Sequence, residues 1–175
     1  MEKQSVAKPK KPLFTTRDLA YTIVMTALLA VVTMTLKIPM PMVGGYLDPG
    51  EFISIFTGIT FGVPVGAVVG GLGPGLADLL GGYPFWMPIT LAVRGLEGAI
   101  FGLGFRRSVY WKIAAAILGQ VWMNIGYFMA YWPLYGWAAA VASTLPFAWM
   151  MLVATAIAIP LHYAVLKAYP RLAFR

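Results

Sequence analysis

The sequence predicts an all-α, polytopic membrane protein with six transmembrane helices. Hydrophobic residues make up 60% of the 175 residues and charged residues only 11%, whereas a soluble domain carries about 25% charge. Short turns rich in Gly and Pro separate the apolar segments, most of which approach the roughly 20 residues that cross a bilayer. The Lys and Arg residues gather between alternate segments and near both termini, which is typical of cytoplasmic loops.

The breaks between apolar segments set the expected elements. Residues 1–15 are polar and hold four lysines, so we expect a disordered basic segment followed by one substrate-binding membrane domain at 16–175. Thr16 is a suitable N-cap for a helix that begins near Arg17 and runs to about residue 36. Pro and Gly predict a loop at 37–49 and a turn at 133–136, and 106–112 is expected to be a basic loop. Further helices are expected at about 50–61, which is too short to span, and at 64–80, 87–105, 113–132 and 137–167.

The distribution of positive charge orients these helices. With the N-terminus in the cytoplasm, eleven of the thirteen Lys and Arg residues fall on the cytoplasmic side, Lys37 falls outside and Arg94 lies within the membrane. Both termini are therefore expected in the cytoplasm. The net charge of +7 fits this placement, so we do not expect nucleic acid as a partner.

Composition also limits the chemistry. The chain has no Cys and a single His, so we expect neither a metal site nor a cofactor. The Gly-rich run at residues 70–75 lacks the Gly-Lys-Ser/Thr ending of a phosphate-binding loop and lies in an apolar segment. The sequence therefore offers no motif for ATP hydrolysis.

Small residues recur at helical spacing and predict close helix packing. They form two series, Gly58, Gly62, Gly66 and Gly70 in one and Gly98 and Gly102 in the other. The first helix has a further small face at Thr22, Thr26 and Ala30. This face has two interpretations, packing within the bundle and docking of a separate membrane subunit, and spacing alone favours packing.

Polar residues at membrane depth are the functional candidates, because ionisable groups there are costly. Trp86, Thr90, Arg94 and Glu97 share one helical face, and Asp78 precedes them near the outer end of the previous helix. A second stripe on the next helix comprises Gln120, Asn124, Tyr127 and Tyr131. The two stripes predict a polar pocket that opens to the outside.

Each of these residues also has a purely structural interpretation. Arg94, Glu97 and Asp78 can neutralise one another and hold two helices together. Gln120 and Asn124 can form interhelical hydrogen bonds. The aromatic residues near the turns can form an interfacial belt, with Trp86 and Tyr135 suited to either role, and His162 is expected at the cytoplasmic interface.

Four motifs carry a resemblance to a known family. They are GGYLDPGE at 44–51, FGVPVGA at 61–67, GLADLLGGYP at 75–84 and RGLEG at 94–98. The sequence resembles the S component, the substrate-binding membrane subunit, of energy-coupling factor (ECF) vitamin transporters, and it is most similar to the riboflavin-transporter-like group. Glu51 stands where that group leads us to expect the acid of a Gly-Asp pair.

The resemblance implies a fold, a ligand and partners. It implies six helices in a bacterial or archaeal cytoplasmic membrane, and a vitamin-like molecule captured from outside beneath the loop that follows the first helix. It implies docking of the first helix on a transmembrane coupling subunit that carries two ATPase subunits, followed by toppling of the whole S component. The family's docking motif is approximated here by Thr22, Thr26 and Ala30, or by Ala27 and Val31.

We therefore predict a high-affinity substrate-capture subunit of an ATP-driven micronutrient importer that binds a small heterocycle and has no enzymatic activity. The predicted substrate-binding residues are Tyr46, Trp86, Arg94, Glu97, Gln120, Asn124, Tyr127 and Tyr135. The alternatives are an intramembrane enzyme or a small secondary carrier that uses Asp78, Arg94 and Glu97. The sequence does not identify the vitamin.

Overall fold

The computed structural model describes residues 14–40 and 45–170 as a helical bundle with one short hairpin. Its helices are α1 (Thr16–Leu36), α2 (Glu51–Phe61), α3 (Val63–Leu80), α4 (Met87–Gly102), α5 (Val109–Tyr135) and α6 (Trp137–Ala168), and its strands are β1 (Ile38–Met40) and β2 (Gly45–Leu47). The predicted all-helical class and six helices in the described part are confirmed. Four of these helices, α1, α3, α5 and α6, are long and apolar enough to cross a membrane.

The first helix begins with a capping box. Thr15 is the N-cap, so the cap lies one residue before the predicted Thr16. The Thr15 hydroxyl accepts a hydrogen bond from the Asp18 amide at 3.2 Å, and the Asp18 carboxylate accepts one from the Thr15 amide at 2.8 Å. The prediction of disorder for the N-terminal segment falls mainly on residues 1–13, which lie outside the described residues.

The segment predicted as a loop at 37–49 contains an antiparallel hairpin. Strands β1 and β2 pair with Ile38 opposite Leu47 and Pro39 opposite Tyr46. The sequence did not predict these strands because Pro and Gly dominate the segment. Both strands of a two-stranded ribbon are edge strands, however, and an edge strand tolerates the missing N–H of Pro39.

Helix α5 is longer at both ends than the sequence predicted. It begins at Val109, so Lys112 lies within the helix and not in the basic loop. At the other end Pro133 stays inside the helix, which ends only at Gly136, where φ is 86°. Pro is tolerated in such helices because neighbouring groups compensate for the lost backbone hydrogen bond, so Pro133 alone did not mark the end.

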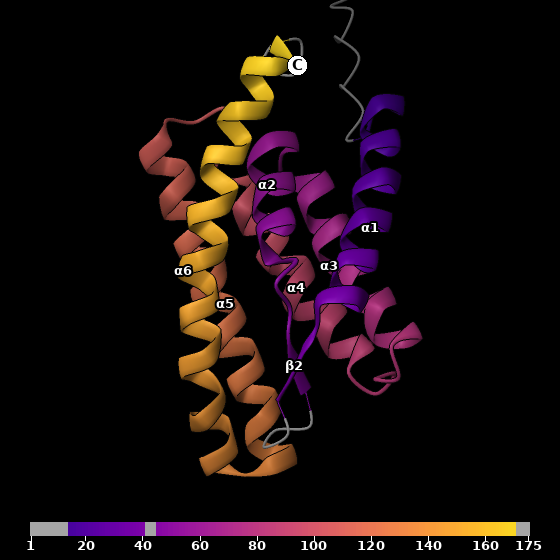
Figure 1. Cartoon of the computed structure of the whole chain (residues 1–175), viewed down its shortest axis with the longest axis vertical. Helices are drawn as coiled ribbons and strands as arrows, with labels where there is room; N and C mark the ends of the chain where they lie inside the picture. Colours follow the sequence, from indigo (N-terminus) through magenta and orange to yellow (C-terminus); the bar gives the residue numbers. More distant parts are fainter. Residues whose placement is uncertain (1–13, 41–44, 171–175) are drawn as a thin grey trace, which may run out of the picture.

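Helix α4 packs against α2, α3 and α5. Helices α5 and α6 run side by side along one side of the bundle and α1 lies on the other (Figure 1). The start of α1 and the end of α6 lie at one end of the bundle, and the hairpin lies toward the opposite end (Figure 1).

Glycines bring α3 and α4 into backbone contact, as the small-residue spacing predicted. A Cβ added at Gly98 would lie 2.1 Å from the Gly66 carbonyl oxygen, and one at Gly70 would lie 2.7 Å from the Arg94 carbonyl oxygen. Only residues without side chains permit this approach. The contact fixes the position of α4, which carries Arg94 into the centre of the bundle.

Candidate functional site

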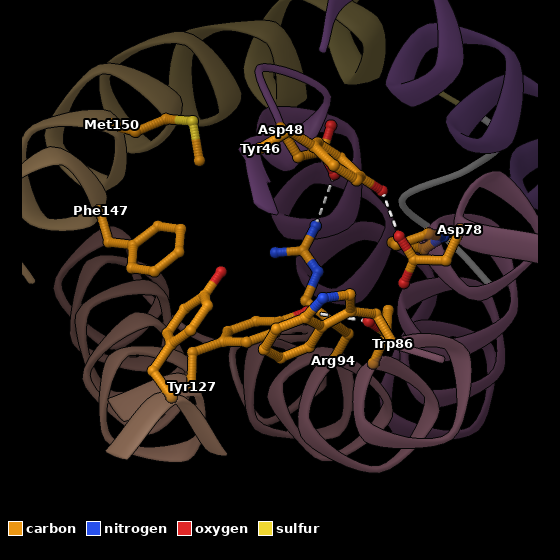
Figure 2. Close-up of a pocket in the computed structure, with 11 residues that line it drawn as sticks. Tyr46, Asp48, Asp78, Trp86, Arg94, Tyr127, Phe147 and Met150 are labelled. Atoms are coloured by element: carbon orange, nitrogen blue, oxygen red, sulfur yellow. Dashed lines mark hydrogen bonds and ion pairs between the residues drawn. The ribbon is translucent and has the colours of Figure 1, made fainter. Parts of the chain in front are cut away.

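A buried arginine lies at the centre of the candidate site. Arg94 is only 2% exposed, and its guanidinium points into a cavity between the hairpin and helices α4 to α6 (Figure 2). Its Nη2 donates to Asp48 Oδ2 at 2.8 Å, and its Nη1 donates to Glu97 Oε2 at 3.0 Å and to Glu51 Oε2. A buried guanidinium requires such partners, because an unpaired charge in an apolar interior is very costly.

The three carboxylates come from three different parts of the chain. Glu97 lies one turn after Arg94 on α4, and Glu51 lies in the first turn of α2. Asp48 follows β2, where its Oδ1 accepts hydrogen bonds from Thr33 Oγ1 on α1 at 3.0 Å and from the Gly50 amide at 2.8 Å. Arg94 therefore links α4 to α2 directly and to the hairpin and α1 through Asp48.

The site contains more acidic than basic groups. Three carboxylates contact one guanidinium, and Glu51 Oε1 and Glu97 Oε1 are buried without a hydrogen-bond partner among the described residues. Burial raises the pKa of Asp48 above its ordinary value, although Arg94 and the Thr33 hydroxyl act in the opposite direction. The surroundings of Arg94 therefore favour ligand groups that donate hydrogen bonds over additional anions.

The hairpin is held over the cavity by a second polar contact. The Tyr46 hydroxyl donates to Asp78 Oδ1 on α3 at 2.6 Å (Figure 2). Burial and the neighbouring Asp78 carboxylate raise the pKa of Tyr46, so its hydroxyl stays protonated and remains a donor. The Tyr46 ring also lies 5.3 Å from the Tyr83 ring, centroid to centroid.

Aromatic side chains form the opposite wall. Trp86 lies 4.8 Å from Tyr131 and stacks nearly parallel on Tyr135 at 6.2 Å, centroid to centroid. Tyr127 stacks on Phe147 of α6 at 5.7 Å. The complete lining is Tyr46, Asp48, Pro74, Asp78, Trp86, Thr90, Arg94, Tyr127, Tyr131, Phe147 and Met150.

The cavity has a volume of about 40 Å³. This is room for a few water molecules and far less than the 300–1,000 Å³ typical of ligand pockets. A heterocyclic ligand therefore requires the aromatic wall or the hairpin to move outward. The structure shows the cavity in a closed arrangement.

Four of the predicted binding residues line this cavity: Tyr46, Trp86, Arg94 and Tyr127. Two others support it without lining it, because Glu97 contacts Arg94 and Tyr135 stacks on Trp86. Asp78 lies on the wall but bonds to Tyr46, and no ion pair joins it to Arg94 among the described residues. The predicted pairing of Arg94 with Glu97 is present.

The structure does not bring Gln120 and Asn124 to the cavity. Gln120 donates to the Met151 carbonyl at 3.0 Å and accepts from Thr155 at 3.1 Å, and Asn124 donates to the Thr144 carbonyl at 3.3 Å. Both residues share a face of α5 with Tyr127 and Tyr131, but α6 covers the part of that face where the amides lie. Their interhelical interpretation is the one that fits these contacts.

Sequence reasoning missed Asp48, Phe147 and Met150. Asp48 lies in the GGYLDPGE motif, within the loop predicted at 37–49, and the sequence does not indicate a partner for its side chain. Phe147 and Met150 lie on a helix that is apolar on all sides, so the sequence does not distinguish their face from the lipid-facing ones. His162, expected at the cytoplasmic interface, is buried within the bundle, with its Nδ1 2.8 Å from Thr60 Oγ1.

The proposed docking residues on α1 also face inward. Thr22, Thr26 and Ala30 are each less than 10% exposed and lie on the side of α1 that faces the bundle. In this conformation these side chains pack within the bundle, which fits the packing interpretation of this face. The alternative pair, Ala27 and Val31, lies on the exposed side of the helix.

Comparison with known proteins identifies three similarities. Residues 13–168 match the family described as the ECF-type riboflavin transporter, S component. An uncharacterized protein of Pyrococcus woesei is 39% identical over 114 residues, which cover 64% of this chain and 76% of the relative. The thiamine precursor transporter HmpT of Lactococcus lactis is 31% identical over 121 residues, which cover 67% of this chain and 68% of that protein.

Proposed function

Because this chain belongs to the family of S components of ECF-type riboflavin transporters, we propose that it is the high-affinity substrate-capture subunit of an ATP-driven importer of a vitamin or vitamin precursor. This family consists of transporter components and not of enzymes, and its members are multi-pass membrane proteins. The observation that carries the proposal is the cavity beneath the hairpin, where Arg94 and Asp48 face an aromatic wall.

We propose that all six helices cross or enter a cytoplasmic membrane, with both termini in the cytoplasm and the cavity facing outward. The cations Arg17, Arg106, Arg107 and Lys167 lie in or beside the segments at the termini end of the bundle, whereas Lys37 precedes the hairpin. This asymmetry supports the orientation. The short α2, with 11 residues, then lies buried within the bundle without spanning by itself.

The proposed substrate is a small flat heterocycle with amino or hydroxyl donors. The ring faces of Trp86 and Tyr127 on the cavity wall are surfaces on which a flat ring can stack, and the carboxylates of Asp48 and Asp78 on the wall are acceptors. The similarity to a thiamine precursor transporter also supports a vitamin precursor as the substrate.

For delivery, we propose that α1 docks on a transmembrane coupling subunit that works with two ATPase subunits. The exposed side of α1 presents Ala20, Val24, Ala27 and Val31 at spacings of four, three and four. Small residues at such spacing allow close helix contact in a membrane. The face is free of the contacts that bury Thr22, Thr26 and Ala30.

The enzyme and carrier alternatives have less support. Their proposed residues are engaged, because Arg94 is paired with three carboxylates and Asp78 accepts from Tyr46. No described residue forms a nucleophile–base pair with them.

The test is ligand identification followed by affinity measurement. Native mass spectrometry of the protein purified in mild detergent identifies any retained molecule, and a panel of thiamine precursors, thiamine and riboflavin is then titrated by tryptophan fluorescence. Trp86→Leu is expected to lower affinity at least about tenfold. Trp149→Leu, at a position 69% exposed on α6, is the matched control and is expected to bind like the wild type. The proposal would be contradicted if the purified protein retained no ligand and bound none of the compounds in the panel.

A further inference from the structure

A second polar cavity lies at the opposite end of the bundle from the substrate site. Its volume is about 220 Å³, and its polar lining comprises Thr60, Arg106, Arg107, Lys112 and His162. These residues come from the end of α2, the connection between α4 and α5, the start of α5, and α6. We propose that this cavity binds a phosphate-type anion, either a free ion or the headgroup of an anionic phospholipid. The proposal does not depend on the capture function.

The cations of this cavity have no carboxylate partner among the described residues. None of Arg106, Arg107 and Lys112 forms an ion pair with an acidic side chain within residues 14–40 and 45–170. The nearby Asp18, in a groove that Arg107 also borders, is engaged with Thr15 in the cap of α1. The cavity therefore concentrates positive charge that no carboxylate in the described part of the chain compensates, which favours an external anion.

The burial of Lys112 distinguishes this cavity from an ordinary solvated basic loop. The residue is only 5% exposed, although a lysine side chain rarely lies in the interior without a counterion. Its Nζ donates to the Arg107 carbonyl oxygen and lies 5.8 Å from the centroid of the Tyr163 ring. An ammonium has three donors, so one carbonyl leaves donor capacity for an anion in the cavity.

His162 provides the second, independent observation. The residue is 3% exposed and lines the cavity, and its Nε2 has no hydrogen-bond partner within the described part of the chain. Its Nδ1 is engaged with Thr60 Oγ1 at 2.8 Å. When Thr60 donates to Nδ1, the neutral ring carries its proton on Nε2 and presents a donor. Buried polar atoms normally find partners, and an anion oxygen would satisfy this one.

The start of α5 adds to the positive field. The N-cap residue, Ser108, makes no side-chain capping bond, and the 27-residue helix begins beside the cavity at Val109. The first amides of a helix attract anions. Arg106 has a φ of 57°, an uncommon conformation for a residue with a side chain. Guanidinium groups suit phosphate because they donate in pairs.

The test uses the full chain in neutral detergent. The thermal unfolding temperature is measured at increasing concentrations of inorganic phosphate, with sodium chloride of equal ionic strength as the reference. Native mass spectrometry compares the retention of phosphatidylglycerol with that of phosphatidylcholine. The variants are Arg107→Gln, at an exposed position that leaves packing intact, and His162→Asn, which keeps a partner for Thr60. Lys167→Gln removes an exposed cation of α6 outside the cavity and is the control.

Saturable stabilisation of the wild type by phosphate, or selective retention of phosphatidylglycerol, is the expected result. Each cavity variant is expected to lower the apparent affinity for phosphate or phosphatidylglycerol about tenfold, whereas Lys167→Gln keeps the wild-type affinity. A response to phosphate alone identifies a soluble anion, and selective lipid retention alone identifies a headgroup. The inference is overturned if the wild type shows neither effect, or if Arg107→Gln and His162→Asn respond like the control.

Discussion

Substitution of one glycine tests whether α3 and α4 meet backbone to backbone. In Gly98→Ala the new Cβ would lie 2.1 Å from the Gly66 carbonyl oxygen and 2.8 Å from the Gly66 carbonyl carbon. Real Cβ atoms essentially never come within 3.0 Å of a neighbour, so the gap must widen by at least 3.0 − 2.1 = 0.9 Å. Both atoms belong to the backbone of α3, so no side-chain rotation relieves the overlap.

The magnitude follows from two opposing terms. Overfilling a packed interface costs about 1–3 kcal/mol. The cost at this site lies at the upper end of that range because the new Cβ meets backbone atoms, which cannot rotate away. Replacing Gly by Ala inside a helix returns up to about 1 kcal/mol. We therefore expect Gly98→Ala to lower the free energy of unfolding by about 2 kcal/mol. Because Arg94 lies one turn earlier on α4, ligand affinity should fall as well.

Gly95→Ala is the matched control on the same helix. There the nearest atom to a new Cβ is the Ala67 carbonyl oxygen at 3.5 Å, which is ordinary contact. This variant should be as stable as the wild type or gain up to about 1 kcal/mol, so the two variants should differ by about 2–3 kcal/mol. The assay is a denaturant titration of the protein in detergent micelles, in which tryptophan fluorescence monitors unfolding. Equal stability of the two variants would refute the close contact of α3 with α4.

Three further predictions concern the site and its partner surface. In Arg94→Lys the point charge of the ammonium cannot match three carboxylates as the planar guanidinium does, so ligand affinity should fall at least about tenfold. Isothermal titration calorimetry measures this affinity, and an unchanged value would place Arg94 outside the site. Tyr46→Phe removes the hydrogen bond to Asp78, so ligand should dissociate about tenfold faster in stopped-flow fluorescence, whereas Tyr83→Phe keeps the contact and the wild-type rate. Ala27→Trp on the exposed face of α1 should abolish uptake in the assembled transporter and leave ligand affinity intact, whereas Leu152→Trp on the exposed face of α6 should affect neither.

The sequence predicted helices better than it predicted which of their faces meet. Continuous apolar segments and Gly-containing turns gave the number of helices, since a membrane chain must satisfy its backbone within helices. The tight approach of Gly66 to Gly98 was also predictable, because a four-residue glycine spacing has few other uses in a membrane. The end of α5 was not, since Pro133 is compatible with either a turn or a continuous helix.

The candidate site was only partly predictable for a different reason. Gln120, Asn124, Tyr127 and Tyr131 share one face of α5, but the sequence does not state where along that face α6 makes contact. Packing of α6 divides the stripe into a part whose amides hydrogen-bond to α6 and a part whose aromatic rings line the cavity. Asp48 gained its role from contacts with Thr33 and Arg94, which are distant in sequence and have no local signature.

The charges around Arg94 suggest how the hairpin can move without disrupting the bundle. Two polar contacts join the hairpin region to α3 and α4, Tyr46 with Asp78 and Asp48 with Arg94, and Asp48 also accepts from Thr33 of α1. If both break, Arg94 still keeps Glu51 and Glu97, so its buried charge remains compensated. Opening then costs about two charge-assisted hydrogen bonds, roughly 1.5–3 kcal/mol each. A cost of this size leaves the open form accessible, and a ligand that donates to the freed Asp48 and Asp78 would recover part of it on closing.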